Sequence, residues 1–346
     1  MIQTFSSWSA LFLAALTVAS CQKNEVVPDS HQTVDHLLIT EVASSGTWHE
    51  SWGREYDYDD YLRITNPSPT TQYLDGLALA KTGLVATKIV NLPAGSDFRT
   101  THFGAGVLLR FPGSVGGTSY PIAPGASIII ARAAVDHTAK PTEKSGFWLW
   151  NPGSYDLSKA NFEWASAAQL QNQNDFPDNP GVPNMTTIFP VQAHRRTNPE
   201  RILPTEGALA LVRIPAEVTD SMLLKMADYK WPLNETTAAR AGGALESGGG
   251  HLTDYDYNPV VLIKIPNAWV IDAVQICPQR DRVWNLIEGL DKGSASVFTS
   301  AIDRKRNLRS YVGKALSRKH DGRKYVDTNN SEVDFEVLPV SLTKQR

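Results

Sequence analysis

The stretch DDYLRITNPSPTTQYLDGLALA, residues 59–80, decides the fold class. It holds two short apolar runs, separated by a segment rich in Pro, Ser and Thr, and Leu-Asp-Gly introduces the second run. Apolar runs of this length between turn-forming residues are typical of antiparallel strands. Because Tyr61, Leu62 and Ile64 alternate only imperfectly with charged neighbours, we expect the first strand to be covered on more than one side.

The same pattern continues along the chain, and 24 Gly and 21 Pro supply frequent turns. The comparable apolar runs are HLLITEVASS (36–45), GVLLRFPG (106–113), ASIIIARA (126–133), GALALVRIP (207–215), VVLIKIPNAWVIDAVQI (260–276) and EVDFEVLPV (332–340). One helix is predicted near residues 219–231, with Thr219 or Asp220 as N-cap and Met222, Leu223 and Met226 on one face. The sequence therefore predicts an all-β antiparallel sandwich with one short helix.

Residues 141–204 differ in composition from the rest of the predicted domain, residues 36–342. They are rich in Asn, Pro, Gln and Asp and contain islands of aromatic residues. We expect a long loop-rich insertion that carries a strand at Phe147–Trp150. A loop of this length without regular structure is unusual unless it has a role or packs on itself.

The N-terminus predicts export followed by lipid anchoring. Residues 10–19, ALFLAALTVA, are too short to span a membrane but suit the apolar region of an export signal. Small residues lead directly into Cys21, which resembles a bacterial lipobox, in which the cysteine is acylated and the signal, here residues 1–20, is removed. The alternative is a secretory signal that merely contains a cysteine, and residues 1–9 lack the usual Lys or Arg. Residues 21–35 are polar and predict a flexible tether.

Three further features indicate where the protein is located and which classes of protein it does not resemble. CQKNE, residues 21–25, resembles the short signals that send lipoproteins of Bacteroidetes-type bacteria to the outer face of the outer membrane. If Cys21 is acylated, Cys277 has no partner, and its apolar neighbourhood predicts a small buried thiol. A net charge of −3 gives no electrostatic footprint for nucleic acid.

Four blocks carry a family resemblance. In order along the chain they are similar to the first strand, the second block, the Pro-Gly turn with its core strand, and the closing block of lamin-tail domains, which are immunoglobulin-like sandwiches. These blocks are ITEVASS (39–45), residues 59–80, IAPGASIIIA (122–131) and ALSRKHDGRKYVDTNNSEVDFEV (315–337). More closely, the chain resembles a family of Bacteroidetes surface lipoproteins of unknown function, through NPGSYDLSKANFEW (151–164) and DFPDNPGVPNM (175–185).

The resemblance implies folding roles, and no catalytic ones, for a set of motif residues. They are Asn66, Asp75, Gly76, Gly125, Arg318, Asp327, Asn329, Asp334 and Phe335. Asn66 and Asn329 are of a type that tolerates left-handed turns, and Asp327 can hydrogen-bond to turn backbone. Arg63 stands where lamin-tail domains often have Glu, so a pair between that Glu and the closing Arg318 would be lost here.

The segment TWHESWGREYDYDDY, residues 47–61, is the richest in functional side chains. Its Asp57, Asp59 and Asp60 could hold calcium, since Asp57 and Asp59 would point the same way on a strand and calcium takes six to eight oxygens. The alternative is a solvated acidic loop whose aromatic residues pack on the edge of the sandwich. No other cofactor is indicated.

Aromatic residues suggest ligand contact, because Trp and Tyr offer flat, rigid surface at low entropic cost. The candidates for a glycan or peptide ligand are Trp48, Trp52, Tyr56, Tyr58, Trp148 and Trp150. The alternative for all of them is packing in the core.

These observations lead us to expect a non-enzymatic, surface-exposed outer-membrane lipoprotein that binds a ligand or partner. The family resemblance implies a TonB-dependent uptake system as the partner class. A calcium-dependent hydrolase and a purely structural envelope protein are the alternatives. The eight histidines show no His-x-x-x-His pattern, and no Gly-x-Ser-x-Gly occurs.

Overall fold

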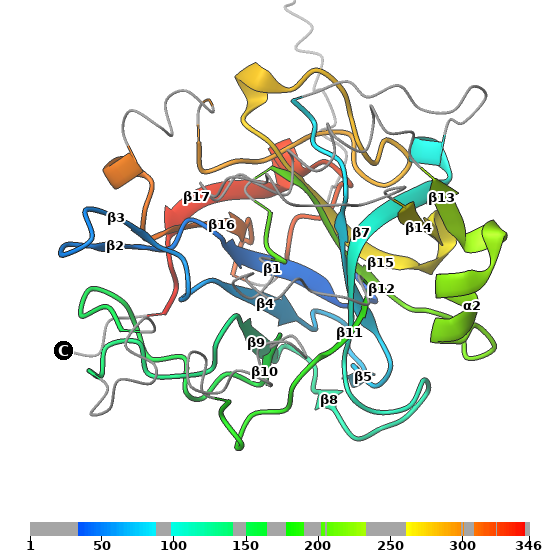
Figure 1. The fold of residues 1–346 in the computed structure, drawn as a ribbon, viewed down its shortest axis with the longest axis horizontal. Helices are drawn as coiled ribbons and strands as arrows, with labels where there is room; N and C mark the ends of the chain where they lie inside the picture. The colour runs from blue at the N-terminus through cyan, green and yellow to red at the C-terminus, as the bar shows by residue number, and fades with distance from the viewer. Residues whose placement is uncertain are drawn as a thin grey trace, which may run out of the picture. The chain divides into compact units, whose positions relative to one another are not determined.

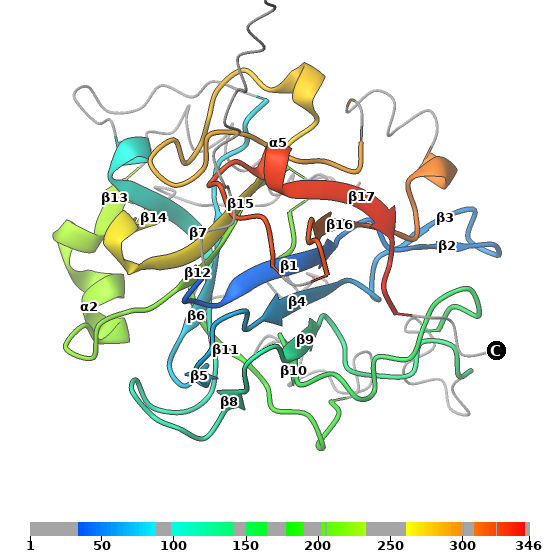
Figure 2. The ribbon, with the colours of Figure 1, turned by 180° about the vertical axis from the view of Figure 1, so that it is seen from behind.

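The computed structural model describes residues 34–87, 98–140, 150–164, 178–189, 202–204, 206–232, 261–298, 300, 308–322 and 324–342. Strands dominate these residues (Figures 1 and 2), and the α-helices among them are α2 (Asp220–Lys225) and α5 (Ser331–Asp334). The expected all-β, sandwich-like fold is confirmed. Cys21 and most of the tether, the Gly-rich segment 239–251 and the basic segment 193–201 lie outside the described residues.

Two large sheets build the sandwich. The first has the order β10 (Phe162–Glu163), β9 (Ser127–Ala131), β4 (Tyr61–Thr65), β1 (Leu38–Ala43), β16 (Lys314–Arg318) and β17 (Phe335–Pro339). The second has the order β13 (Lys230–Pro232), β14 (Val261–Pro266), β7 (His102–Arg110), β6 (Ala78–Thr82), β12 (Gly207–Val212) and β15 (Val270–Ile276), and β11 (Thr186–Phe189) also pairs with β7. All pairs are antiparallel except β9 with β10, which is parallel.

Two-stranded sheets and short 3-10 turns lie outside these two large sheets. Two hairpin-like sheets join β2 (Thr47–His49) to β3 (Arg54–Tyr56) and β5 (Gln72–Tyr73) to β8 (Pro121–Ile122). Short 3-10 turns are η1 (Phe98–Thr100), η3 (Ala227–Tyr229), η4 (Asn267–Trp269), η5 (Gln279–Asp281) and η6 (Leu308–Ser310). Sequence reasoning missed the β2–β3 pair and strand β16.

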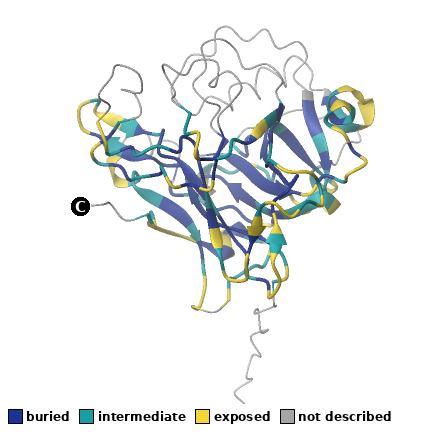
Figure 3. Ribbon diagram, turned by 90° about the horizontal axis from the view of Figure 1, so that it is seen from below, coloured by how far each residue is buried: buried dark blue, intermediate teal, exposed yellow. Residues whose placement is uncertain are grey.

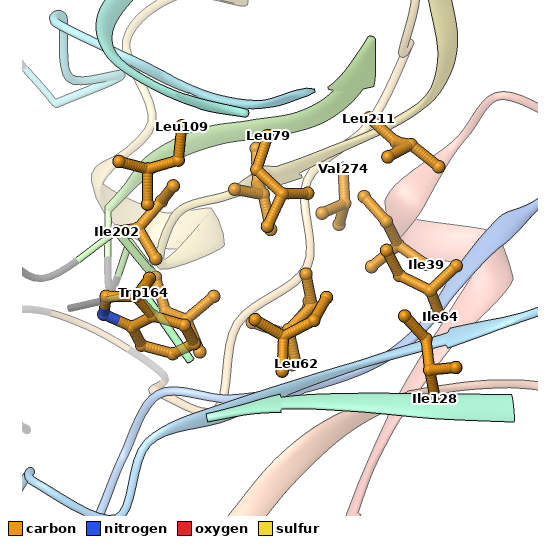
Figure 4. Close-up of a cluster of buried hydrophobic side chains, with 14 of the residues drawn as sticks. Ile39, Leu62, Ile64, Leu79, Leu109, Ile128, Trp164, Ile202, Leu211 and Val274 are labelled. Carbon is orange, nitrogen blue, oxygen red and sulfur yellow. The ribbon is translucent and has the colours of Figure 1, made fainter. Parts of the chain in front are cut away.

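The main core lies between the two sheets (Figure 4). Leu62 and Ile64 of the first sheet face Leu79 and Leu211 of the second, and all four are fully buried. Tyr61 belongs instead to a second apolar cluster on the other face of the first sheet. The prediction that this strand is covered on more than one side is therefore confirmed. Figure 3 shows buried residues along the strands and exposed residues gathered in the connections.

The outer face of the second sheet is also covered. Its cluster includes Phe103, Ile265 and Cys277, together with Leu223 from α2. Thr219 is the N-cap of α2, as expected, and its hydroxyl accepts from the Met222 N–H. The expected apolar helix face is only partly right, because Leu223 alone in the helix is buried and Met226 is 41% exposed.

The insertion packs onto both sheets where it is described. It supplies β10 to the first sheet and β11 to the second, and places Phe162 and Trp164 in the core between them. In the described part this segment is cover for the sandwich. Most of the expected strand at 147–150 lies outside the described residues, and Trp150 itself belongs to no strand.

The motif turns are fixed by hydrogen bonds and by glycine. Buried Asn66 donates to the carbonyls of Thr70 and Ile122, and Asp75 accepts from the Ser119 and Tyr120 N–H groups. Positive φ occurs at Gly76 (69°), Gly125 (73°) and Asn329 (54°). Asn66 is not among the positive-φ residues, so the left-handed conformation that its type tolerates is not used there. Its side-chain amide and its backbone N–H and carbonyl all form hydrogen bonds that fix the turn.

The closing block forms a buried charge network centred on Arg318. Both carboxylate oxygens of Asp272 lie 2.8–2.9 Å from Arg318 Nη2, Asp327 lies 3.1 Å from Nη1, and Nε donates to the Ile39 carbonyl. The guanidinium also lies over the Phe335 ring, at 4.7 Å. Arg318 therefore has acidic partners other than the one replaced at position 63.

Two further carboxylates, those of Glu41 and Asp334, also accept several hydrogen bonds near the C-terminal segment. Arg63 pairs with Glu41 of β1 at 3.0 Å, and Glu41 also accepts from Tyr61 Oη and from Ser341. Asp334 accepts from the N–H groups of Thr328 and Asn330, which fixes the turn before β17. Buried carboxylates thus hold the C-terminal segment against the sheets.

Candidate functional site

The aromatic-rich segment 47–61 forms the β2–β3 hairpin and a turn into β4. Figure 1 shows the hairpin (dark blue) extending beyond the strands of the first sheet. It is fastened to residues 150–154, because Asn151 donates to Thr47 Oγ1 (2.8 Å) and to the Trp48 carbonyl (3.1 Å). Its side chains are therefore held on a fixed support.

His49 organises the aromatic rings on one side of the hairpin. It is 3% exposed and stacks on Trp52, with ring centroids 3.9 Å apart and planes at 7°. Its Nδ1 accepts from the Trp52 N–H, so Nε2 carries the proton that it donates to the Trp150 carbonyl, at 3.2 Å. The Trp150 ring meets His49 edge-on at 6.3 Å.

Tyr56 and Tyr58 lie beneath these rings in a small buried cluster with Ala133. The Tyr56 hydroxyl donates to His137 Nδ1 at 2.6 Å, because His137 Nε2 faces the Ala133 carbonyl, which can only accept. Burial raises the pKa of Tyr56 well above its usual value. For these two tyrosines the structure favours the packing alternative, and neither presents a free ring face.

A cation lies over each described tryptophan of the candidate set. Arg54 lies 5.3 Å from the Trp52 ring centroid and Lys140 lies 5.5 Å from that of Trp150. We call Trp52, Arg54, Lys140 and Trp150 the tryptophan–cation surface. All three tryptophans 48, 52 and 150 are partly exposed. Trp148 lies outside the described residues.

Trp48 carries a similar pair but points from the opposite side of β2, since side chains alternate along a strand. Arg309 lies 4.9 Å over its ring, and Glu50 forms an ion pair with Arg309. The charge of this cation is therefore balanced within the protein. Lys140 and Arg309 are remote in sequence from segment 47–61, and nothing in the sequence pattern indicated them.

The structure does not gather the three candidate calcium ligands into one group. Residues 57–60 form a turn, so the expectation that Asp57 and Asp59 project together from a strand is wrong. Asp57 pairs with Arg132 at 3.2 Å, and Asp59 and Asp60 are fully buried. Across the described residues, no group of three or more His, Cys, Asp or Glu side chains is arranged to hold a metal ion.

Asp59 is a buried carboxyl that links the hairpin to the insertion. Its Oδ2 accepts from Thr47 Oγ1 at 2.5 Å and from Ser154 Oγ at 2.6 Å, while Oδ1 has no partner among the described residues. Burial raises its pKa to about 7, and the two hydroxyls only partly counter this effect. A carboxyl whose pKa is raised to about 7 therefore joins β2 to residues 150–154.

The family model "Protein of unknown function (DUF4876)" matches residues 123–341. The chain belongs to the DUF4876 family. The crystal structure of a DUF4876 family protein from Bacteroides thetaiotaomicron VPI-5482 is similar, with a TM-score of 0.65 and 25% sequence identity over 90% of this chain and 75% of that one. No curated protein matches.

The matched region of this DUF4876 protein includes part of the candidate surface. It covers Lys140 and Trp150, whereas the hairpin with Trp52 and Arg54 precedes residue 123. No helix among the described residues is long and apolar enough to cross a membrane.

Proposed function

We propose that this DUF4876 protein is a surface-exposed outer-membrane lipoprotein, acylated at Cys21, that binds a glycan or peptide ligand without catalysing a reaction. The observation that carries the binding role is the tryptophan–cation surface. Its rings are partly exposed and are fixed by hydrogen bonds and stacking, so little conformational entropy would be lost when a ligand binds. The lamin-tail resemblance supports the same role, because it assigns the motif residues to folding only.

The lipid anchor is supported by the sequence alone. Small residues precede Cys21, and a single buried methylene contributes about 0.8 kcal/mol to membrane affinity, so several acyl chains hold a protein firmly. Mass spectrometry of the mature N-terminus tests this directly: a diacylated or triacylated Cys21 is expected. A mature chain that begins elsewhere, or carries an unmodified Cys21, would contradict it.

Surface exposure is tested on intact cells. Added proteinase should remove the protein while a periplasmic marker survives. An untouched chain, in cells whose known surface proteins are cut, would exclude exposure. We propose a TonB-dependent transporter as the partner, following the family resemblance, and cross-linking in intact cells followed by mass spectrometry would identify it.

Ligand binding is tested with glycan and peptide arrays. The mature chain with Cys21→Ser is compared with its Trp52→Ala and Trp150→Ala variants, and Trp269→Ala, remote in the second sheet's outer cluster, is the matched control. Binding that is lost in the first two variants and kept in the control is expected. Binding to no array, or binding insensitive to both tryptophans, would favour a purely structural role.

A further inference from the structure

The tryptophan–cation surface presents positive charges to a ligand in addition to its aromatic rings. Trp52 has His49 stacked against it at 3.9 Å and the Arg54 guanidinium lying over its ring. The amino group of Lys140 lies over the Trp150 ring. A ligand that approaches these rings therefore meets a cation at each of them.

Within the described residues, no acidic side chain forms an ion pair with either cation. Three acidic side chains of segment 47–61 have partners elsewhere: Glu50 pairs with Arg309, Asp57 with Arg132, and Asp59 accepts from two hydroxyls. Both Arg54 and Lys140 are exposed. Two exposed cations therefore remain beside a set of fixed rings.

Their placement suits an anionic ligand. A guanidinium that lies over a ring can direct its in-plane N–H donors outward, where they match the oxygens of a carboxylate or a sulfate. Its position over the ring also restricts its rotamers before any ligand arrives, which lowers the entropic cost of binding. Lys140 supplies a second, point-like charge.

The two charges belong to one connected set of side chains, which favours a ligand with repeated anionic groups. Arg54 lies over Trp52, Trp52 stacks on the buried His49, His49 meets the Trp150 ring edge-on, and Lys140 lies over Trp150. A glycan of acidic sugars carries charged groups on successive units, so one chain can offer an anion to each cation.

We propose that the tryptophan–cation surface binds an acidic glycan, with carboxylate or sulfate groups of nearby sugar units held by Arg54 and Lys140. This inference rests on the proposed binding function and names its ligand class. Binding should weaken with added salt, because both contacts are charged and solvent-exposed.

The test compares matched polymers. The probes are polygalacturonic acid, its carboxyl-reduced neutral form, chondroitin sulfate, its desulfated form and poly-glutamate, each measured by biolayer interferometry at about 50 and about 300 mM NaCl. The protein is the mature chain with Cys21→Ser, alone and with Arg54→Met/Lys140→Met. Lys225→Met, which removes an exposed charge on α2, is the control, and thermal melting confirms that each variant folds.

We expect at least one charged polymer to bind, to lose affinity about tenfold in the double methionine variant, and to keep it in Lys225→Met. Failure of both charged polymers, or equal binding of a charged polymer and its neutral form, would overturn the acidic-glycan inference. Poly-glutamate binding as tightly as the polysaccharides would replace it with an acidic peptide. Binding of a neutral glycan that needs Trp52 but neither cation would keep the proposed function and remove this inference.

Discussion

Asp59 shows how a single residue makes this fold sensitive to pH. The carboxyl is fully buried with two hydroxyl donors and no cation, and burial raises its pKa to about 7. Between its usual pKa of 3.8 and about 7 the unfolded chain is ionised while the folded chain keeps the proton. Stability from this group is therefore lost as pH rises through that window, and the loss levels off above the folded pKa.

Replacing Asp59 with Asn tests this effect, because Asn resembles the protonated acid and can still accept from Thr47 and Ser154. Relative to the native chain, Asp59→Asn should gain about 2 to 3 kcal/mol of unfolding free energy between about pH 5 and about pH 8. Urea denaturation at both pH values gives the double difference, which cancels the contributions of other raised carboxyls such as Glu163 and Asp272. The exposed Asp228→Asn is the control. Equal pH slopes for the native chain and Asp59→Asn would contradict the assignment.

Arg318 is also buried, but unlike Asp59 it is a charged group with several partners of opposite charge. Arg318→Met would leave Asp272 buried without its cation, and removing one partner of such a pair typically costs about 3 to 5 kcal/mol. Burial already raises the pKa of Asp272 to about 6 although Arg318 lowers it, so the deficit should shrink as pH falls and Asp272 takes up a proton. Denaturation by urea measures both effects.

An exposed pair serves as the comparison for Arg318. Arg309 and Glu50 have side chains that are 61% and 78% exposed, so Arg309→Met should cost less than about 1 kcal/mol. Similar losses for the two methionine variants would mean that the buried network contributes no more than a surface contact.

At the scale of elements, two glycine turns introduce strands of opposite sheets. Gly76 precedes β6 and Gly125 precedes β9, and their φ angles are nearly the same, 69° and 73°. They differ in their surroundings: a Cβ on Gly76 would lie 2.7 Å from the Val115 backbone, whereas one on Gly125 would meet nothing within 4 Å. Substituting each glycine in turn therefore separates the cost of backbone strain from the cost of a steric clash.

Gly125→Ala should therefore cost about 1 to 2 kcal/mol, the strain of a left-handed Ala. Gly76→Ala should cost about 1 to 3 kcal/mol more, because the backbone at Val115 must move. Thermal denaturation of both variants measures the difference. A Gly125→Ala loss as large as that of Gly76→Ala would show that the contact with Val115 contributes nothing.

For the whole molecule, the question is whether both faces of the second sheet unfold together. One face packs in the core between the sheets, and the other forms the cluster that contains Cys277. The Cys277 thiol is fully buried and free, and burial raises its pKa to about 12. The prediction that this cysteine is a buried thiol is confirmed.

Cys277 can report on that outer cluster. In the Cys21→Ser chain, where it is the remaining thiol, it should not react with a thiol reagent under native conditions. Labelling in urea should follow the same midpoint as tryptophan fluorescence, as two-state unfolding requires. Labelling at a lower urea concentration than the fluorescence change would show that the outer cluster opens separately.

The fold class and the positions of most core strands could be predicted from local sequence patterns. Short apolar runs bounded by Pro, Gly and Asn specify strands through local geometry. Strands β1, β4, β9, β12, β14, β15 and β17 fall within the predicted runs, and β6 and β7 overlap theirs. The N-cap at Thr219 and the left-handed Asn329 are local features of the same kind. The β2–β3 hairpin was missed because its polar and aromatic residues lack a clear apolar alternation.

The arrangement of the candidate site depends on tertiary contacts. The tertiary structure moved Tyr56, Tyr58 and Asp59 from candidate surface residues into the interior, because residues 133–137 and 150–154 cover them. It also brought Lys140 over Trp150 and gave Arg318 its partner Asp272, 46 residues away. Burial and charge pairing depend on which distant segments meet, and hydrophobic pattern and turn chemistry encode only where each strand begins and ends.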